Sequence, residues 1–404
     1  MTSDRLYSKS LSYLNTLCSE IIERCVGSEG NRQATYFFEK ELTSLGWETT
    51  MPEFDAMDWE ENGAVLRSGE TYFNVLVSPY TLGFKGEAEL VSASYVTELE
   101  NLDGKGKFIL LRGEIAKEQL MPKNFVFYNP EEHQRIITLL ENSGARAIIS
   151  ATGRNAALAG GIYPFPLIED GDFNIPSVYM TEEEGKKLSM CTGMKLFLDS
   201  KSKRIPGKGY NVTGKKGKNN SQRIVVTAHI DAKKGTQGAI DNATGVIVLL
   251  LLADLLKDYH GNKLIEIVAF NGEDYYAVPG QMNYIAANQN NFSQILLNIN
   301  IDGAGYKKGP SAFSLFSLPD HLNSTVHEII SQYPGICEGV QWPQGDHSIF
   351  LQFGVPAIAV SSKWFTDNIN EQDITHTPRD NIEIVDCSRL VEISKALDMF
   401  IRRI

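Results

Sequence analysis

The segment RIVVTAHID, residues 223–231, predicts the fold of this 404-residue chain, because its β-branched run ends on polar residues. The same pattern recurs in LIEIVAFNGED at 264–274 and in QILLNINIDGAG at 294–305. A fourth apolar run, GVPAIAVSS at 354–362, leads into the segment that contains His376. Short apolar runs bounded by glycine, proline and charge indicate buried strands, of the kind found in parallel sheets.

The polar residues at the ends of these predicted strands indicate a single site. They are His229, Asp231, Glu273, Asp274 and Asp302. In open α/β sheets, ligands bind just outside the carboxyl ends of the strands. We therefore expect an α/β fold with a mixed, mainly parallel central sheet, helices on both of its faces, and one functional site at this edge.

Composition narrows the classes of function. Hydrophobic residues make up 42% of the chain and charged residues 22%, which is typical of a soluble globular protein. The formal net charge of −12 argues against nucleic-acid binding, which needs a basic surface. The longest apolar run, residues 246–256, is too short to span a bilayer and contains Asp254. We expect it to form a buried helix, and we expect no membrane association.

The N-terminal segment and the cysteines favour a cytoplasmic location. Residues 1–22 contain no uninterrupted apolar core of the signal-peptide type. The five cysteines form no CxxC pair or regular framework, so mostly free thiols are expected. Secretion with a leader that has been removed is the alternative.

The pattern of predicted strands and helices changes twice along the chain. From about residue 60, short strand-like runs are separated by Gly, Asn and Asp turns, with one helix-like segment at 130–145. Further along, strand and helix alternate to the end of the chain. We therefore expect a discontinuous domain of residues 1–59 and 196–404, interrupted by a β-rich domain of residues 60–195.

Three local patterns add detail to this outline. Residues 5–46 have the apolar spacing of two helices, with Gly46 placed as a C-terminal cap. The basic, glycine-containing stretch at 201–220 is interpreted as a solvated surface turn. The segment at 387–404 has the pattern of an amphipathic closing helix.

The residue types at the expected sheet edge suit a pair of divalent metal ions. Two ions about 3.5–4 Å apart can clamp both oxygens of a hydrolytic transition state. Such a pair needs roughly two imidazoles and three carboxylates, one of them shared, and a further carboxylate that accepts a proton from water. Zinc accepts this mixture of nitrogen and oxygen ligands. His229 and His376 supply the imidazoles.

The carboxylates of this set have distinguishable positions. Asp241, in GAIDNATG just before the long apolar helix, suits the shared position. Glu273 and Asp274 are adjacent, so one is expected to ligate and the other to act as base. Asp302 follows a strand in the same way as the others. Asp231 lies two residues after His229, on the same side of an extended segment, and is expected to brace the imidazole.

At these residues the chain resembles the co-catalytic zinc aminopeptidases, metallopeptidase family twenty-eight, which also contain glutamate carboxypeptidases and glutaminyl cyclases. The segments that carry the resemblance are AHIDAKKGTQGAIDNATG, FNGEDYYAVPG, NIDGAG, GDHSIFLQFGVPAIAVSS and THTPRDN. RCVGSEGNRQATYFFEKELTSLGW, residues 24–47, is similar to the N-terminal helix pair of the family. The resemblance implies the phosphorylase/hydrolase-like fold of zinc exopeptidases. It also implies that the inserted region is a protease-associated domain, through GKGKFILLRGE, ENSGARAIIS and FNIPSVYMTEEEGKKL.

Carried over by position, the resemblance implies two zinc ions per chain and peptide substrates. His229, Asp241 and Asp302 would hold one zinc ion. Asp241, Asp274 and His376 would hold the other. Glu273 would be the general base and later the acid that protonates the leaving amine. The inserted domain would be a lid or a substrate-selecting element, and the oligomeric state stays open.

Three features depart from the family pattern. Asp274 stands where many relatives have Glu, so its reach is one methylene shorter. Thr375 stands where many relatives place a Tyr aimed at the tetrahedral oxyanion. His347 or Tyr306 could take over that role, with packing or helix capping as the alternative for each. Most relatives with such an insert are exported, whereas this N-terminal segment has no export signal.

An aminopeptidase is the leading hypothesis, and three alternatives stay open. Carboxypeptidase or dipeptidase action calls for a cationic pocket for the substrate carboxylate, for which Lys363 and Arg379 are the candidates. Glutaminyl cyclisation uses the same scaffold with one zinc ion and part of the ligand set. A non-enzymatic, peptidase-like module would have lost ligands, and none is lost here.

Overall fold

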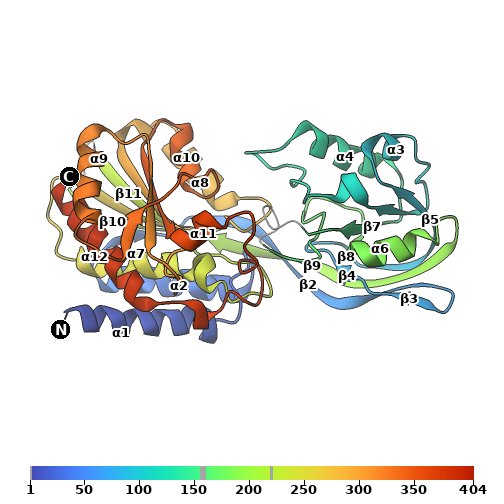
Figure 1. The fold of residues 1–404 in the computed structure, drawn as a ribbon, viewed down its shortest axis with the longest axis horizontal. Helices are drawn as coiled ribbons and strands as arrows, with labels where there is room; N and C mark the ends of the chain where they lie inside the picture. The colour runs from blue at the N-terminus through green and yellow to red at the C-terminus, as the bar shows by residue number, and fades with distance from the viewer. Residues whose placement is uncertain (1, 155–160, 219–221) are drawn as a thin grey trace. The chain divides into compact units, whose positions relative to one another are not determined.

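The computed structural model describes residues 2–154, 161–218 and 222–404. The chain divides into two compact units, the first formed by Met1–Ala56 and Lys208–Ile404 and the second by Met57–Gly207. Both boundaries fall inside long strands, β2 (Glu53–Ser68) and β9 (Lys195–Tyr210), which Figure 1 shows in blue and green. The domain limits expected at 59/60 and 195/196 stay a prediction.

The first unit is built on an eight-stranded sheet with the order β1-β10-β12-β11-β13-β16-β14-β15. Its strands are β1 (Glu48–Thr50), β10 (Val212–Gly217), β11 (Arg223–His229), β12 (Leu264–Phe270), β13 (Ile295–Ile301), β14 (Ser311–Phe316), β15 (Ile336–Glu338) and β16 (Ala357–Ser362). The four central strands β12, β11, β13 and β16 are parallel, as are β14 and β15. The remaining three pairings are antiparallel, so the sheet is mixed and its parallel part is the central block.

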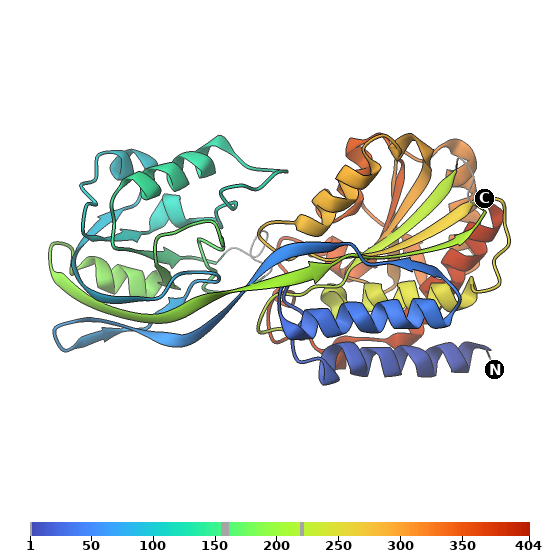
Figure 2. The same cartoon turned by 180° about the vertical axis from the view of Figure 1, so that it is seen from behind.

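Helices cover both faces of this sheet. Figures 1 and 2 show α1, α2, α7 and α12 on one face, and α8 and α10 lie on the other. The helices of the unit are α1 (Thr2–Asn15), α2 (Glu29–Ser44), α7 (Thr244–Leu255), α8 (Pro279–Asn288), α9 (Asp320–Ile330), α10 (His347–Gln352), α11 (Lys363–Asp367) and α12 (Cys387–Arg403), with short turns η1 (Thr16–Glu20), η3 (Ala239–Ala243), η4 (Phe292–Gln294) and η5 (Ile382–Ile384). The expected closing helix is therefore confirmed as α12.

The core of the unit explains why α7 has so few polar residues. Every residue of α7 from Thr244 to Asp254 is buried, between the sheet and the helices α1, α2 and α12. Burying a leucine side chain contributes about 1.5–3 kcal/mol, so this helix is a large part of the stability of the unit. The expectation of a buried helix at 246–256 is confirmed. Among the described residues, no helix combines the length and the apolar character needed to cross a bilayer.

The second unit has its own mixed sheet, with the order β3-β2-β9-β5-β6-β7-β8-β4. Its remaining strands are β3 (Thr71–Phe73), β4 (Leu76–Val77), β5 (Phe84–Ala93), β6 (Phe108–Leu111), β7 (Ala147–Thr152) and β8 (Ser177–Thr181), and its helices are α3 (Val96–Glu100), η2 (Gly113–Ala116), α4 (Glu131–Asn142) and α6 (Glu182–Ser189). Strands β5, β6, β7 and β8 are parallel. Each face of the sheet has its own hydrophobic cluster, so the unit has a core independent of the first.

The expected surface turn at 201–220 is wrong. Residues 201–210 lie in β9 and residues 212–217 in β10, whereas residues 219 and 220 lie outside the described part of the chain. The charges have cross-strand partners, because Lys208 Nζ lies 2.9 Å from Glu53 Oε1 and 2.8 Å from Asp55 Oδ1. Opposite charges that face each other across a strand pair stabilise a sheet. The stretch is therefore strand rather than turn, and its exposed Lys208 forms ion pairs with acidic residues of β2.

Candidate metal centre

The carboxyl ends of the central parallel strands position the candidate residues. His229 is the last residue of β11, and Asp302 directly follows β13. Asp274 lies four residues beyond β12, in the turn that leads to α8. Asp241 is in η3, immediately before α7, and His376 lies in the loop after α11. All five residues belong to the first unit.

The structure brings these five side chains together around Asp241. Asp241 Oδ1 lies 3.1 Å from His229 Nε2, and the other oxygen, Oδ2, lies 3.1 Å from His376 Nε2. His229 Nε2 is 3.5 Å from Asp302 Oδ1, and His376 Nε2 is 2.9 Å from Asp274 Oδ1. Each imidazole therefore faces a carboxylate of its own and one oxygen of Asp241. This is the arrangement in which one carboxylate can be shared between two cations.

Two side-chain atoms of this cluster are buried and have no hydrogen-bond partner in the described part of the chain, which is expected of atoms that bind a metal ion. His229 Nε2 and Asp274 Oδ2 are buried, and within the described residues neither has a hydrogen-bond partner. Ligand atoms of His229, Asp241 and Asp274 lie within 4.8 Å of one another. Buried polar atoms are normally hydrogen-bonded, and an unpaired one calls for an explanation such as an ion. Two imidazoles and three carboxylates are a donor set that zinc accepts.

The acid–base properties of the cluster show how strongly these groups interact. Burial alone would raise the pKa of Asp241, but the imidazoles of His229 and His376 hold it well below its usual range. Burial raises the pKa of Asp302, and the charges of Asp241 and Asp274 raise it further. The pKa of each histidine is well above its usual value, although burial opposes this, because carboxylates surround both rings. A bound cation would take the place of the protons that these groups hold.

Glu273 lies beside the cluster with a different environment from its neighbour Asp274. Its pKa is raised well above the usual value by burial and by the negative charges of Asp274 and Asp302, while His229 opposes the shift. It is partly exposed, whereas Asp274 is buried. A carboxylate with a raised pKa that keeps access to the site is suited to accepting and returning a proton.

Asp231 braces more than the imidazole that it was expected to hold. Its carboxylate accepts hydrogen bonds from the backbone N–H groups of Gly272 (2.8 Å), Glu273 (3.3 Å) and Asp274 (3.0 Å). His229 Nδ1 lies 3.2 Å from the backbone carbonyl of Asp231 and 3.7 Å from the carboxylate. The imidazole is therefore oriented by the main chain, and the Asp231 side chain fixes the turn that carries Glu273 and Asp274.

The two candidates for the oxyanion role lie in packed surroundings. His347 is fully buried, its ring centroid is 4.7 Å from those of Phe316 and Trp342, and its Nε2 is 3.0 Å from the carbonyl of Trp342. Burial lowers the pKa of His347 to about 4. The ring of Tyr306 packs on Trp364 and Phe365. For both residues the geometry favours the packing alternative.

Two buried aspartates near the cluster were not expected from the sequence. Asp346 accepts a hydrogen bond from Gln281 Nε2 at 2.9 Å, and burial, with the charges of Asp302 and Asp231, raises its pKa to about 7 although His229 opposes the shift. Asp380 accepts hydrogen bonds from the backbone N–H groups of Ile240 at 2.7 Å and Asp241 at 3.0 Å. Burial and the charge of Asp241 raise the pKa of Asp380 to about 7. Both lie inside recognised segments, GDHS and THTPRDN, but nothing in those segments shows which atoms they contact.

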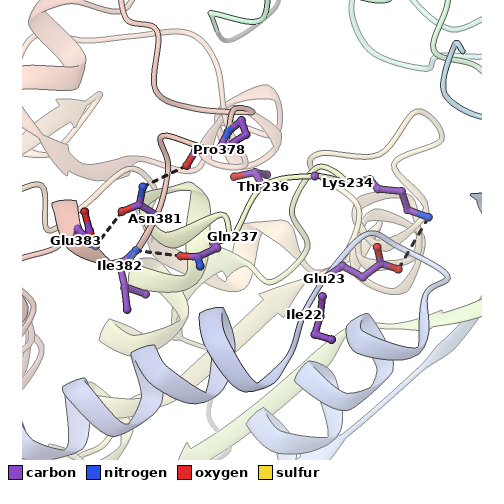
Figure 3. A pocket seen from close by; sticks show the side chains of 10 residues that line it. Ile22, Glu23, Lys234, Thr236, Gln237, Pro378, Asn381, Ile382 and Glu383 are labelled. Carbon is purple, nitrogen blue, oxygen red and sulfur yellow. Dashed lines mark hydrogen bonds and ion pairs between the residues drawn. The ribbon is translucent and has the colours of Figure 1, made fainter. Parts of the chain in front are cut away.

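The loops that carry Asp241 and His376 also line a pocket of about 720 Å³, shown in Figure 3. Within it, the backbone N–H of Ile382 donates a hydrogen bond to Gln237 Oε1 at 3.2 Å. On the other side of the pocket, Lys234 Nζ lies 3.9 Å from Glu23 Oε1. The pocket is therefore lined by parts of these loops, and none of the five candidate ligands is among its lining residues.

Comparisons with known proteins agree with this fold. Residues 211–401, which contain all five candidate ligands, match the model of peptidase family M28. The chain is 25% identical to aminopeptidase YwaD of Bacillus subtilis (strain 168) over 304 residues, which are 71% of this chain and 60% of that protein. The matched part thus spans less than two thirds of the length of that relative.

Two solved structures share the fold over nearly the whole chain. The aminopeptidase from Aneurinibacillus sp. strain AM-1 is 18% identical, with a TM-score of 0.77 and coverage of 98% of this chain and 93% of the other. BSAP, a zinc aminopeptidase from Bacillus subtilis, is 19% identical, with a TM-score of 0.72 and coverage of 98% and 94%. At these identities the likeness establishes the fold: a mixed α/β architecture with a second unit.

Proposed function

We propose that this chain is a zinc-dependent aminopeptidase that binds two metal ions and removes the N-terminal residue of peptides. The observation that carries the proposal is the position of Asp241, whose two oxygens face His229 and His376 separately. His229, Asp241 and Asp302 are proposed to hold one zinc ion, and Asp241, Asp274 and His376 the other. When bound, the ions would supply Lewis acidity toward the scissile carbonyl and lower the pKa of a bound water.

Glu273 is proposed to move the proton of the reaction. Its raised pKa suits a base that accepts a proton from the attacking water and returns it to the leaving amine. Asp231 holds the backbone N–H of Glu273, so the side chain starts from a fixed position. Asp274 is anchored by the same carboxylate, which separates the roles of the two adjacent acids.

Action on the N-terminus is favoured over action on the C-terminus. A carboxypeptidase needs a cation that is available to the substrate carboxylate. Lys363 is partly exposed and lies 2.6 Å from Asp367, and Arg379 is exposed and paired with Asp373. Each candidate cation therefore already has an acidic neighbour. The relatives of known structure quoted above are also aminopeptidases by name.

The other two alternatives are disfavoured by the ligand set. Glutaminyl cyclisation uses one zinc ion, whereas here a complete second set faces Asp241 through His376 and Asp274. A non-enzymatic module would not need Glu273 beside this set. The second unit is proposed to be a protease-associated domain that influences which peptides are hydrolysed.

The test is hydrolysis of a panel of aminoacyl-p-nitroanilides by the purified protein, with a parallel panel of N-acetylated analogues and of C-terminal substrates. We expect release from free N-termini only, with loss of activity in chelator and recovery on addition of zinc. Release from blocked or carboxyl-terminal substrates would redirect the assignment to another exopeptidase. Chelator-resistant release would contradict the metal centre.

A further inference from the structure

A buried arginine that precedes residues 211–401, the part matched by the family model, contacts the loop between two of the candidate ligands. Arg24, between η1 and α2, is 2% exposed. Its Nε donates to the carbonyl of Ile230 at 3.0 Å, and its Nη2 donates to the carbonyl of Gly238 at 2.7 Å. Its Nη1 donates to the carbonyls of Leu17 at 2.8 Å and Gln237 at 2.9 Å. The guanidinium thus binds both ends of the loop that joins His229 to Asp241.

The local backbone is adapted to this approach. Gly238 has a φ of +55°, and a Cβ at this position would lie 2.9 Å from Arg24 Nη2 and 2.5 Å from the side chain of Ala232. Only glycine adopts this conformation at no cost and leaves the space for the guanidinium. A planar fork with several donors in fixed directions is needed to reach carbonyls on both ends of one loop, which a lysine ammonium does not provide.

Asp380 holds the same stretch from the opposite direction. Arg24 binds the carbonyls of Gln237 and Gly238, whereas the Asp380 carboxylate accepts from the N–H groups of Ile240 and Asp241. In the stretch from Gln237 to Asp241, two carbonyl groups are therefore held by Arg24 and two N–H groups by Asp380. Asp241, whose oxygens face the two imidazoles, is the last residue of this stretch.

The segment that contains Arg24 also reaches the Glu273 turn. Asn31 Nδ2 donates to the carbonyl of Arg24 at 2.9 Å and to Asn271 Oδ1 at 2.8 Å. Asn271 Nδ2 returns a hydrogen bond to Asn31 Oδ1 at 2.9 Å. Asn271 is two residues before Glu273. One N-terminal segment thus anchors the loops on both sides of the centre.

We propose that Arg24 is a positioning residue, which together with Asp380 fixes the shared carboxylate of Asp241 between the two metal positions. The inference rests on the proposed function, since it assigns Arg24 a role toward the metal pair. A functional constellation needs its groups within roughly 0.5 Å of the productive geometry, and that precision comes from the residues behind it. Loss of such support typically lowers metal affinity by about 10- to 100-fold.

The test compares Arg24→Lys with Arg223→Lys in the full-length protein. Arg223 is also buried, donates to Glu266 Oε2 at 3.0 Å and to Asn288 Oδ1 at 2.7 Å, and begins the strand β11 that His229 ends. Arg223 is therefore a suitable control, because it is buried like Arg24 and lies at the opposite end of β11 from His229. Three quantities are measured: zinc affinity by chelator competition, the visible spectrum of the cobalt-substituted protein, and the melting temperature of the metal-free protein.

We expect Arg24→Lys to weaken zinc binding by about 10- to 100-fold, to shift the cobalt bands, and to lower kcat with little change in KM. Arg223→Lys is expected to bind zinc like the original protein, even if both variants lose similar thermal stability. Asp380→Asn, which places an amide against two N–H donors, serves as the second variant if Arg24→Lys does not fold, and is expected to weaken zinc binding in the same way.

The outcomes separate this inference from the proposed function. Normal zinc affinity and an unchanged cobalt spectrum in Arg24→Lys, or in Asp380→Asn where only that variant folds, would overturn the positioning role while leaving the metal centre intact. Equal loss of zinc affinity in Arg24→Lys and Arg223→Lys would reduce the effect to general destabilisation and would also overturn it. Absence of zinc binding by the original protein would refute the proposed function itself, and the inference with it.

Discussion

Glu273 and Asp274 are adjacent acids in one turn, but their surroundings differ. Asp274 faces His376 and is buried, whereas Glu273 is partly exposed and has a raised pKa. The Asp231 carboxylate binds both of their backbone N–H groups and so fixes which side chain points where. The proposed distinction between ligand and base therefore depends on the support of the turn as well as on the two residues.

Replacing Glu273 by Gln is expected to lower kcat by about 10²- to 10⁴-fold, because the amide cannot accept the proton of the attacking water. Zinc content should stay unchanged, since Glu273 is not among the proposed ligands. Glu371→Gln, at an exposed position, is the control and should keep full activity. Steady-state kinetics and metal analysis check the prediction, and substantial turnover by the Glu273 variant would remove this residue from the mechanism.

Asp241 and Asp302 are expected to respond differently to substitution. Asp241→Asn should weaken both metal positions together, because each oxygen of Asp241 faces a different imidazole. Asp302→Asn should affect mainly the position shared with His229. Metal analysis after dialysis against a fixed zinc concentration distinguishes the two. Equal stoichiometry in both variants would contradict the shared role of Asp241.

The sequence predicted which residues meet at the site, but not how they are supported. The five candidate ligands could be found because each follows an apolar strand or belongs to a recognised segment. Asp231 was expected to hold an imidazole, but the sequence did not indicate that its carboxylate also binds three main-chain N–H groups. Arg24 begins a recognised segment, but nothing in that segment indicates its role. Its partners are backbone carbonyls, which every residue carries, so the sequence does not identify them.

At the scale of elements, the single charged residue of α7 is paired with cations of α1. Asp254, 2% exposed, lies 2.6 Å from Arg5 Nη1 and 3.0 Å from Lys9 Nζ of α1. Burial would raise the pKa of Asp254, but hydrogen bonds and ion pairs with these two cations hold it below the usual value. The N-terminal helix is thus attached to the core by charge as well as by apolar contacts.

Replacing Asp254 by Asn should destabilise the first unit by about 1–3 kcal/mol, because it weakens hydrogen bonds to charged groups in a buried place. Since the folded-state pKa is lowered, this stability is present above the unfolded-state pKa of about 3.9 and is lost as the pH falls below it. Denaturant unfolding at neutral and acidic pH checks this. A difference between the two proteins that stayed constant down to acidic pH would contradict the ion-pair explanation.

Elements were predicted well where one physical signal dominates. The helices α7 and α12 follow from apolar content and from amphipathic spacing. The stretch at 201–220 was misinterpreted because lysines and glycines are typical of turns. Its strand conformation depends on partners far away in sequence, such as Glu53 and Asp55, which no local pattern reveals.

At the scale of the whole molecule, the chain has two units with separate cores, and the proposed chemistry lies in the first. The first contains every residue proposed to bind metal or move a proton, and its family match begins at residue 211. Residues before that point still contribute, because Arg24 and Asn31 bind the loops of the centre. A mixed sheet was expected, but the sequence did not indicate which pairings are antiparallel, since the direction of a strand is set by its connections.

The most direct test of the two-metal aminopeptidase is a titration of the metal-free protein with zinc, followed by the rate of release of an N-terminal residue. The shared position of Asp241 predicts that zinc binds to about two equivalents per chain and that full activity is reached only then. Full activity at one equivalent, or activity without any metal, would contradict the account.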